Sequence, residues 1–71
     1  MPQQILADIT AHVGQVLVTE GTTVTAGDTL AILESMKMEI PVEADTAGTV
    51  TKLAVIEGDV LREGALIAEI S

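Results

Sequence analysis

The sequence predicts an all-β fold, a flattened structure of two small antiparallel sheets related by pseudo-two-fold symmetry. Three observations predict it. Val, Ile and Thr dominate the chain without a helical period, glycine or Asp-Thr clusters interrupt it at short intervals, and one long pattern occurs twice. Because each half is too small to bury a sheet face alone, we expect the two halves to pack against each other.

The repeated pattern has the same spacing in both copies. It occupies residues 20–30 and again residues 57–67, an offset of 37 residues, and both copies read Glu-Gly-x-x-apolar-x-x-Gly-x-x-apolar. Upstream, the Gly-x-Val of residues 14–16 is echoed by the Gly-x-Val of residues 48–50. The segment that joins the halves, around positions 36 and 37, therefore lies at the seam of a duplicated fold.

Alternating apolar residues between glycine turns predict six strands and two short ones. All candidate turns contain glycine except the one at Met36 and Lys37. With no Phe, Tyr or Trp, the core must be built from Val, Ile, Leu, Ala and Met, and we expect residues 1–71 to form a single domain. The expected strands are Gln4–Thr10, Gly14–Thr19, Thr23–Thr25, Thr29–Ser35, Met38–Glu43, Gly48–Val55, Val60–Leu61 and Ala65–Ile70.

Composition excludes several classes of function. Eleven acidic against three basic residues give a net charge of −8, which repels nucleic acid and anionic membranes. The absence of cysteine excludes disulfides and thiol chemistry, and the single His12, expected at the surface or an edge, makes no metal or base constellation. No apolar run is long enough to span a membrane, and no signal peptide is recognisable. We expect a soluble, acidic, cytoplasmic protein with no nucleic-acid or membrane partner.

The residues around Met36 and Lys37 predict a hairpin with a two-residue loop, in which Lys37 lies at the tip. Counting outward, the expected pairs are Ser35 with Met38, Glu34 with Glu39, Leu33 with Ile40, Ile32 with Pro41 and Ala31 with Val42. One face of the hairpin then carries a nearly unbroken apolar set. The other face carries the glutamates, with Leu30 and Ile32 near its base.

Two features of this hairpin break local rules. A two-residue loop favours positive φ at its central residues, and a residue with a Cβ there costs roughly 1–2 kcal/mol. Glu34 and Glu39 would also be cross-strand neighbours of like charge, which is destabilising. Rule-breaking at one place in a regular chain indicates function or strain. From spacing alone, a solvated surface lysine beside two incidental methionines is the alternative.

The segment Glu34-Ser35-Met36-Lys37-Met38 resembles the biotin-acceptor motif Glu-Ala-Met-Lys-Met, with Ser in place of the more frequent Ala. Together with the glycine repeats, it makes the chain from Ile5 to Ile70 similar to the biotinyl/lipoyl attachment domains, and most similar to small stand-alone members of that family. The resemblance implies a barrel-sandwich hybrid of two four-stranded antiparallel sheets. It also implies an acceptor lysine at an exposed hairpin tip.

Carried over residue by residue, the resemblance implies that Lys37 bears biotin as an amide and that Met36, Met38 and Glu34 flank it as recognition residues. Biotin protein ligase would attach the cofactor. The chain would then be a carrier, not an enzyme, serving the biotin carboxylase and carboxyltransferase components of a biotin-dependent carboxylase, with the acyl-CoA type favoured. No catalytic residue and no metal is expected.

Some alternatives stay open in the sequence. Met36 is expected to be exposed for contact, whereas Met38 could equally pack inside. A lipoyl carrier, or one that accepts either cofactor, is the second hypothesis, although lipoyl domains usually have Asp before the lysine and Ala after it. An unmodified β module that binds a partner is the third.

Overall fold

The structure is a computed structural model that describes residues 3–71, and these residues form eight strands. The strands are β1 (Gln3–Leu6), β2 (Ala11–Val16), β3 (Thr23–Val24), β4 (Thr29–Ser35), β5 (Met38–Glu43), β6 (Gly48–Leu53), β7 (Val60–Leu61) and β8 (Leu66–Ile70). Within this part of the chain there is no helix with the length and apolar character that crossing a membrane takes. The domain expected for residues 1–71 also includes Met1 and Pro2, which lie outside the described residues.

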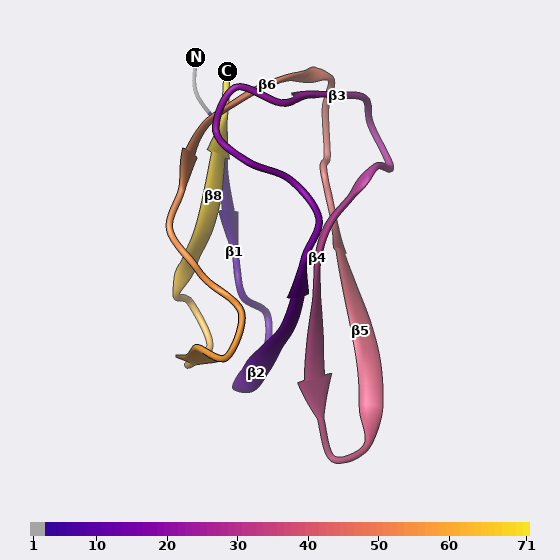
Figure 1. The fold of residues 1–71 in the computed structure, drawn as a ribbon, viewed down its shortest axis with the longest axis vertical. Coiled ribbons are helices and arrows are strands. Elements are labelled where there is room, and N and C mark those ends of the chain that lie inside the picture. The colour runs from indigo at the N-terminus through magenta and orange to yellow at the C-terminus, as the bar shows by residue number, and fades with distance from the viewer. Residues whose placement is uncertain (1–2) are drawn as a thin grey trace.

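The strands form two four-stranded sheets, as predicted. The terminal sheet has the order β1-β8-β6-β3, and the hairpin sheet has the order β5-β4-β2-β7. All neighbouring strands are antiparallel. Figure 1 shows the two sheets packed face to face. Each sheet takes two strands from each half of the chain, so neither half completes a four-stranded sheet by itself.

The two halves are equivalent at a constant offset of 37 residues. The amide of Gly21 donates to the carbonyl of Val50 over 2.7 Å, and the amide of Gly58 donates to the carbonyl of Val13 over 2.8 Å. The structural equivalent of Val50 is therefore Val13. The expected correspondence of residues 14–16 with residues 48–50 was wrong by three positions, because glycine recurs at different points of the two strands.

The duplication also accounts for the glutamates of the repeat. Glu20 accepts a hydrogen bond from the amide of Leu53 over 3.1 Å, and Glu57 accepts one from the amide of Val16 over 3.1 Å. Each carboxylate thus satisfies a strand amide of the other half. These bonds join the halves beyond the sheet ladders.

The core consists of aliphatic side chains in symmetric pairs. The largest side chains with almost no exposed surface are Leu30 and Ile67, Leu33 and Ile70, and Val13 and Val50. Each pair is separated by 37 positions. Because an interior of this kind gains its stability from apolar burial alone, a short chain without aromatics depends on both copies.

The strand bounds agree with the expected ones in the hairpin and differ in the first two strands. β4, β5 and β7 have the predicted bounds, whereas β1 ends at Leu6 and β2 begins at Ala11. Both backbone groups of Ala7 bond to the turn at Gly64 and Ala65, and the chain then leaves the terminal sheet. At the ends of β3, β6 and β8 the differences are one or two residues, which is the usual uncertainty of such bounds.

The base of β4 also corrects an expectation. Leu30 was expected on the outer face, but Leu30 and Ala31 are both 0% exposed. The register with β5 shifts between Thr29 and Ala31, and such a bulge turns two consecutive side chains toward the core. The equivalent residues of β8, Ile67 and Ala68, are likewise 0% exposed.

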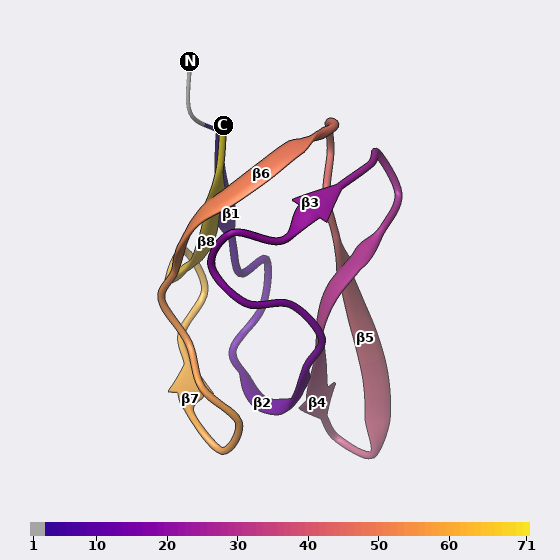
Figure 2. The ribbon, with the colours of Figure 1, turned by 45° about the horizontal axis from the view of Figure 1, so that its top comes forward.

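The hairpin of β4 and β5 reaches one end of the long axis of the molecule, whose extent is 32 Å. Figures 1 and 2 place the C-terminus and the start of β1 at the opposite end. In the duplicated arrangement, the hairpin turn and the chain ends occupy equivalent positions. The turn therefore projects from one end of the molecule (Figure 1).

Candidate functional site

The turn at Met36 and Lys37 has the strained backbone that the sequence predicts. Its φ angles are 51° at Met36 and 67° at Lys37. Every other residue with positive φ in the described part of the chain is a glycine. The pairs of Ser35 with Met38 and of Glu34 with Glu39 are those expected, so the hairpin register is confirmed. Two adjacent left-handed residues turn the chain tightly and place both side chains beyond the last strand pair.

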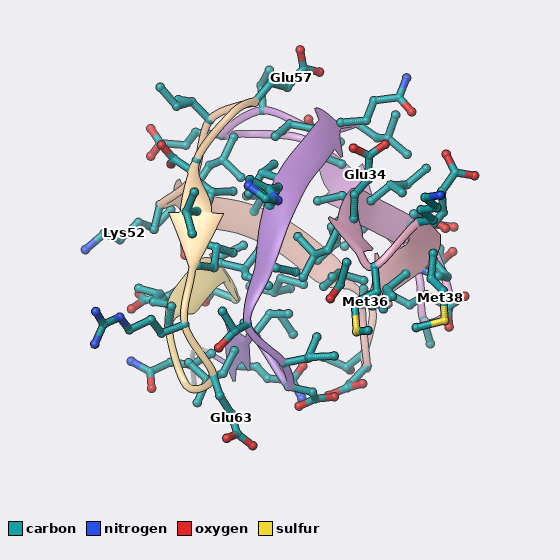
Figure 3. The ribbon with its side chains drawn as sticks, turned by 90° about the horizontal axis from the view of Figure 1, so that it is seen from below. Glu34, Met36, Met38, Lys52, Glu57 and Glu63 are labelled. Atoms are coloured by element: carbon teal, nitrogen blue, oxygen red, sulfur yellow. The ribbon has the colours of Figure 1, made fainter. Side chains whose placement is uncertain are left out.

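The side chains at the turn are exposed. Lys37 is exposed, Met36 is 89% exposed and Met38 is 55% exposed. Met38 therefore does not pack inside. The expectation that methionine helps to build the core was wrong for residues 3–71. The reason is the position of Met38, because the pair of Ser35 and Met38 lies beyond the buried Leu33. Figure 3 shows Met36 and Met38 on the hairpin, on the side of the molecule opposite Lys52.

Glu34 lies next to the turn but leans away from it. A Cβ added to Gly14 would come within 2.8 Å of Cδ of Glu34 and within 2.9 Å of its Cγ, so the Glu34 side chain lies across this glycine. Gly14 is farther from the turn than Glu34, at the bulge where β2 shifts its register with β4. Glu34 and Glu39 are both exposed, so water and salt screen the repulsion between them.

His12 is exposed, as expected for a surface residue, but the sequence did not predict its position beside the turn. It lies in β2, between β4 and β7 and not at a sheet edge, and it pairs with Glu34 on one side and Val60 on the other. The predicted start of the second strand, at Gly14, concealed this position. The apolar, polar, apolar order of Ala11, His12 and Val13 is the sequence signal that could have placed it in a strand.

A shallow, open depression borders the turn. The residues that line it are His12, Glu34, Ser35, Met36, Lys37, Met38 and Glu39. Within residues 3–71, no group of three His, Cys, Asp or Glu side chains is placed to hold a metal ion. The depression is therefore a surface around a primary amine, with carboxylates and thioethers as neighbours.

Chemically, this arrangement presents a nucleophile without the groups that would activate it. The Lys37 side chain extends roughly 6 Å beyond its Cα at ordinary bond lengths, from the end of a narrow hairpin. An enzyme active site can therefore enclose the amine, provided that it comes close to the tip of the hairpin. The lining of the depression offers no group placed to activate the acyl donor, so the donor must arrive already activated by another protein.

Comparison with known proteins identifies the family. The family model described as biotin-requiring enzyme matches residues 1–70. The biotinylated protein TB7.3 homolog of Mycobacterium leprae is 52% identical over 71 residues, which cover 100% of both chains. The biotin/lipoyl attachment protein of Bacillus subtilis is 46% identical over 57 residues, or 80% of this chain and 78% of its own length.

Larger proteins contain a similar segment. The biotin-dependent acyl-coenzyme A carboxylase alpha3 subunit of Mycobacterium leprae is 44% identical over 93% of this chain, which spans 11% of that subunit. The crystal structure of the Kluyveromyces lactis urea carboxylase superposes with a TM-score of 0.93 at 31% identity, over 100% of this chain and 6% of that protein. The predicted fold of two antiparallel sheets is thus confirmed.

Proposed function

We propose, since the chain belongs to the family of the biotin-requiring enzymes, that it is a biotin carrier protein with Lys37 as its attachment residue. The observation that supports Lys37 most strongly is the backbone at the turn. Two residues with positive φ and no glycine hold an exposed lysine at the end of the molecule. A merely solvated lysine does not need this strain, which is a recognisable feature of functional sites.

The chain contributes an amine and its presentation. The Nζ atom of Lys37 attacks the acyl carbon of activated biotin, the C–N bond forms as the bond to the leaving group breaks, and the surplus proton passes to the ligase or solvent. The product is a neutral amide, so the lysine loses its charge. When attached, biotin supplies the ureido nitrogen that takes up and releases a carboxyl group. The hairpin keeps this group on an arm of roughly 15 Å, beyond the folded domain.

Lys37 differs from the other lysine in both position and surroundings. Lys52 lies within β6, one residue before the end of the strand, and its backbone pairs with Glu69 of β8. An extended strand cannot present its side chain to an enclosing active site as a turn does. Met36, Met38 and Glu34 are the flanking residues that a ligase or carboxylase would contact, and all three are exposed.

The partners proposed for the carrier are a biotin protein ligase and the biotin carboxylase and carboxyltransferase components of a carboxylase in the cytoplasm. The acyl-CoA type is supported by the similarity to the acyl-coenzyme A carboxylase subunit. A lipoyl carrier is less well supported, because Met36 and Met38 flank the lysine in place of the usual Asp and Ala, and because a relative that this chain covers completely is a biotinylated protein.

Intact mass spectrometry tests this proposal. Protein from cells grown with biotin is expected to show the mass increment of one biotinyl group, and Lys37→Arg is expected to show none while keeping its fold. The arginine variant preserves charge and exposure, so its thermal unfolding should match that of the wild type. Biotin on the variant at comparable stoichiometry would refute Lys37 as the attachment residue, and a lipoyl increment on the wild type would refute the biotin function.

A further inference from the structure

The outer face of the hairpin sheet carries a row of residues that the other half of the protein does not repeat. Val60 pairs with His12, and His12 pairs with Glu34, one step behind the turn. At an offset of 37 residues, the terminal sheet has Thr23 paired with Thr49, whose backbone bonds in turn to Ser71. The same position of the same fold thus reads Val-His-Glu in one sheet and Thr-Thr-Ser in the other.

The apolar residues in and beside this row are exposed. Val60 is 65% exposed, and Ile56, in the turn that precedes β7, is 70% exposed. Their equivalents in the other half are Thr23 and Thr19, which are also exposed. Valine and threonine have nearly the same shape and both suit a strand, so packing does not require the apolar residue. The fold accepts threonine at both positions, so the two apolar side chains, four residues apart in and beside β7, are free to contact another molecule.

We infer that Val60, His12 and Glu34, with Ile56 beside them, form a docking strip for the biotin protein ligase. The inference rests on the proposed function, because it requires Lys37 to be the residue that the ligase modifies. The ligase surface that fits the strip has an apolar patch for Ile56 and Val60, with cationic side chains opposite Glu34 and Glu39. This charge follows from the net charge of −8 on the carrier.

The length of the lysine side chain identifies the ligase as the occupant. Nζ reaches roughly 6 Å from the turn, so the active site of the ligase must come close to the hairpin. A standard interface buries about 800 Å² on each partner, equivalent to a disc of roughly 16 Å radius. Val60 lies two strands away from β4, which is about 10 Å at ordinary strand spacing, and is therefore covered. A carboxylase that works at the end of the biotinyl arm can contact the tip of the hairpin without covering Val60.

Steady-state kinetics with the biotin protein ligase of the source organism test the strip. The double variant Ile56→Thr with Val60→Thr gives the hairpin sheet the residues of the other half. We expect its KM to rise about tenfold, equivalent to about 1.4 kcal/mol, with kcat within about twofold. His12→Thr, which introduces the residue found at Thr49, should raise KM by a smaller factor.

Leu17→Ala is the matched control. Leu17 is 47% exposed and apolar, its equivalent in the other half is Ala54, and its amide bonds to Leu30 at the end of β4 remote from the turn. The KM of the ligase for the Leu17→Ala variant should equal its KM for the wild type. Thermal unfolding of each variant checks that the fold is kept. Once biotinylated at saturating concentration, the double variant should support carboxylation at the wild-type rate.

Three results would refute the proposal that the strip docks the ligase. They are an unchanged KM for the double variant, an equal rise in KM for Leu17→Ala, or a loss confined to the carboxylation assay. In each case biotin on Lys37 at saturation would leave the proposed function intact. A wild-type protein that accepts no biotin from the ligase would instead refute the proposed function, and the docking strip with it.

Discussion

The Met36-Lys37 turn and the glycine turns all contain residues with positive φ, but the residue types differ. The glycine turns occur in symmetric pairs, Gly21 with Gly58 and Gly27 with Gly64, and all four have φ between 90° and 96°. The Met36-Lys37 turn has φ of 51° and 67° without a glycine. Within residues 3–71, no second pair of adjacent residues has positive φ.

This difference indicates two roles. The glycine turns only connect strands, whereas the Met36-Lys37 turn also presents its side chains at the end of the hairpin. Glycine adopts positive φ without steric conflict, so the paired turns are unstrained. A Cβ at Met36 and at Lys37 brings strain of roughly 1–2 kcal/mol for each residue, and the regular ladder of β4 and β5 must hold it. The strain has a use only if the side chains themselves are needed at the end of the hairpin.

The largest effect is expected from exchanging Met36 and Lys37. Both positions have positive φ and both side chains are exposed, so stability should stay within about 1 kcal/mol of the wild type. The amine would leave the hairpin in another direction, and misplacement of a reacting group by about 1 Å can cost a factor of about 100. We expect kcat/KM for biotinylation to fall by about that factor, measured with purified ligase. Equal rates for the two proteins would show that the ligase does not read the turn geometry.

A glycine turn should show the opposite behaviour. Gly58→Ala changes a residue with φ of 96°, and no atom lies within 4 Å of the added Cβ, so the change tests backbone strain alone. We expect a loss of about 2 kcal/mol in the free energy of unfolding, measured by urea denaturation. The folded variant should be biotinylated at the wild-type rate. A loss below about 0.5 kcal/mol would mean that this fold tolerates positive φ at any residue, and the turn at Lys37 would not be exceptional.

The methionines should affect what happens after attachment. Met36→Ala with Met38→Leu leaves the amine in place, so the variant should still accept biotin, although more slowly. Both side chains are exposed, so unfolding should not confuse the result. Carboxyl transfer by the biotinylated variant is expected to slow by roughly threefold to tenfold, because exposed methionines adapt to partner surfaces. Steady-state carboxylation rates identical to those of wild type would confine the methionines to a role with the ligase.

The smallest effect is expected from Met36→Gly. Glycine removes strain of roughly 1–2 kcal/mol at one residue, but its freedom in the unfolded chain offsets roughly 0.5–1 kcal/mol of this. We expect a net stabilisation of about 0.5 kcal/mol, observed as a small rise in the midpoint of urea unfolding. A clear destabilisation would mean that the Met36 side chain makes a contact that holds the turn.

The sequence predicted the hairpin better than any other element. The alternation on both sides of Met36 and Lys37, with no glycine between, permits one register only, and the structure has it. The start of β2 could not be read in the same way. Residues 7–10 continue an apolar and polar alternation although the chain is crossing between sheets, and that crossing depends on the distant bonds of Ala7 to Gly64 and Ala65.

The residues of the candidate site also fall into those that local sequence predicts and those that depend on distant contacts. Lys37 and its neighbours in sequence could be named from the motif, because a hairpin tip is local. The placement of His12 and Val60 beside Glu34 depends on the pairing of β2 with β4 and β7, which joins residues far apart in the chain. The burial of Leu30 and the exposure of Met38 were also concealed, since a bulge and the end of the core interrupt a simple alternation.

Peptide mapping of the biotinylated protein tests the central claim most directly. The central claim is that the strained turn selects one lysine for attachment. Protein biotinylated by purified ligase, digested and analysed by tandem mass spectrometry, should carry a single biotinyl group, and that group should lie on Lys37. Lys52 and the N-terminal amine should carry none. Biotin on Lys52, or spread over both lysines, would contradict the claim that the geometry of the turn determines the attachment site.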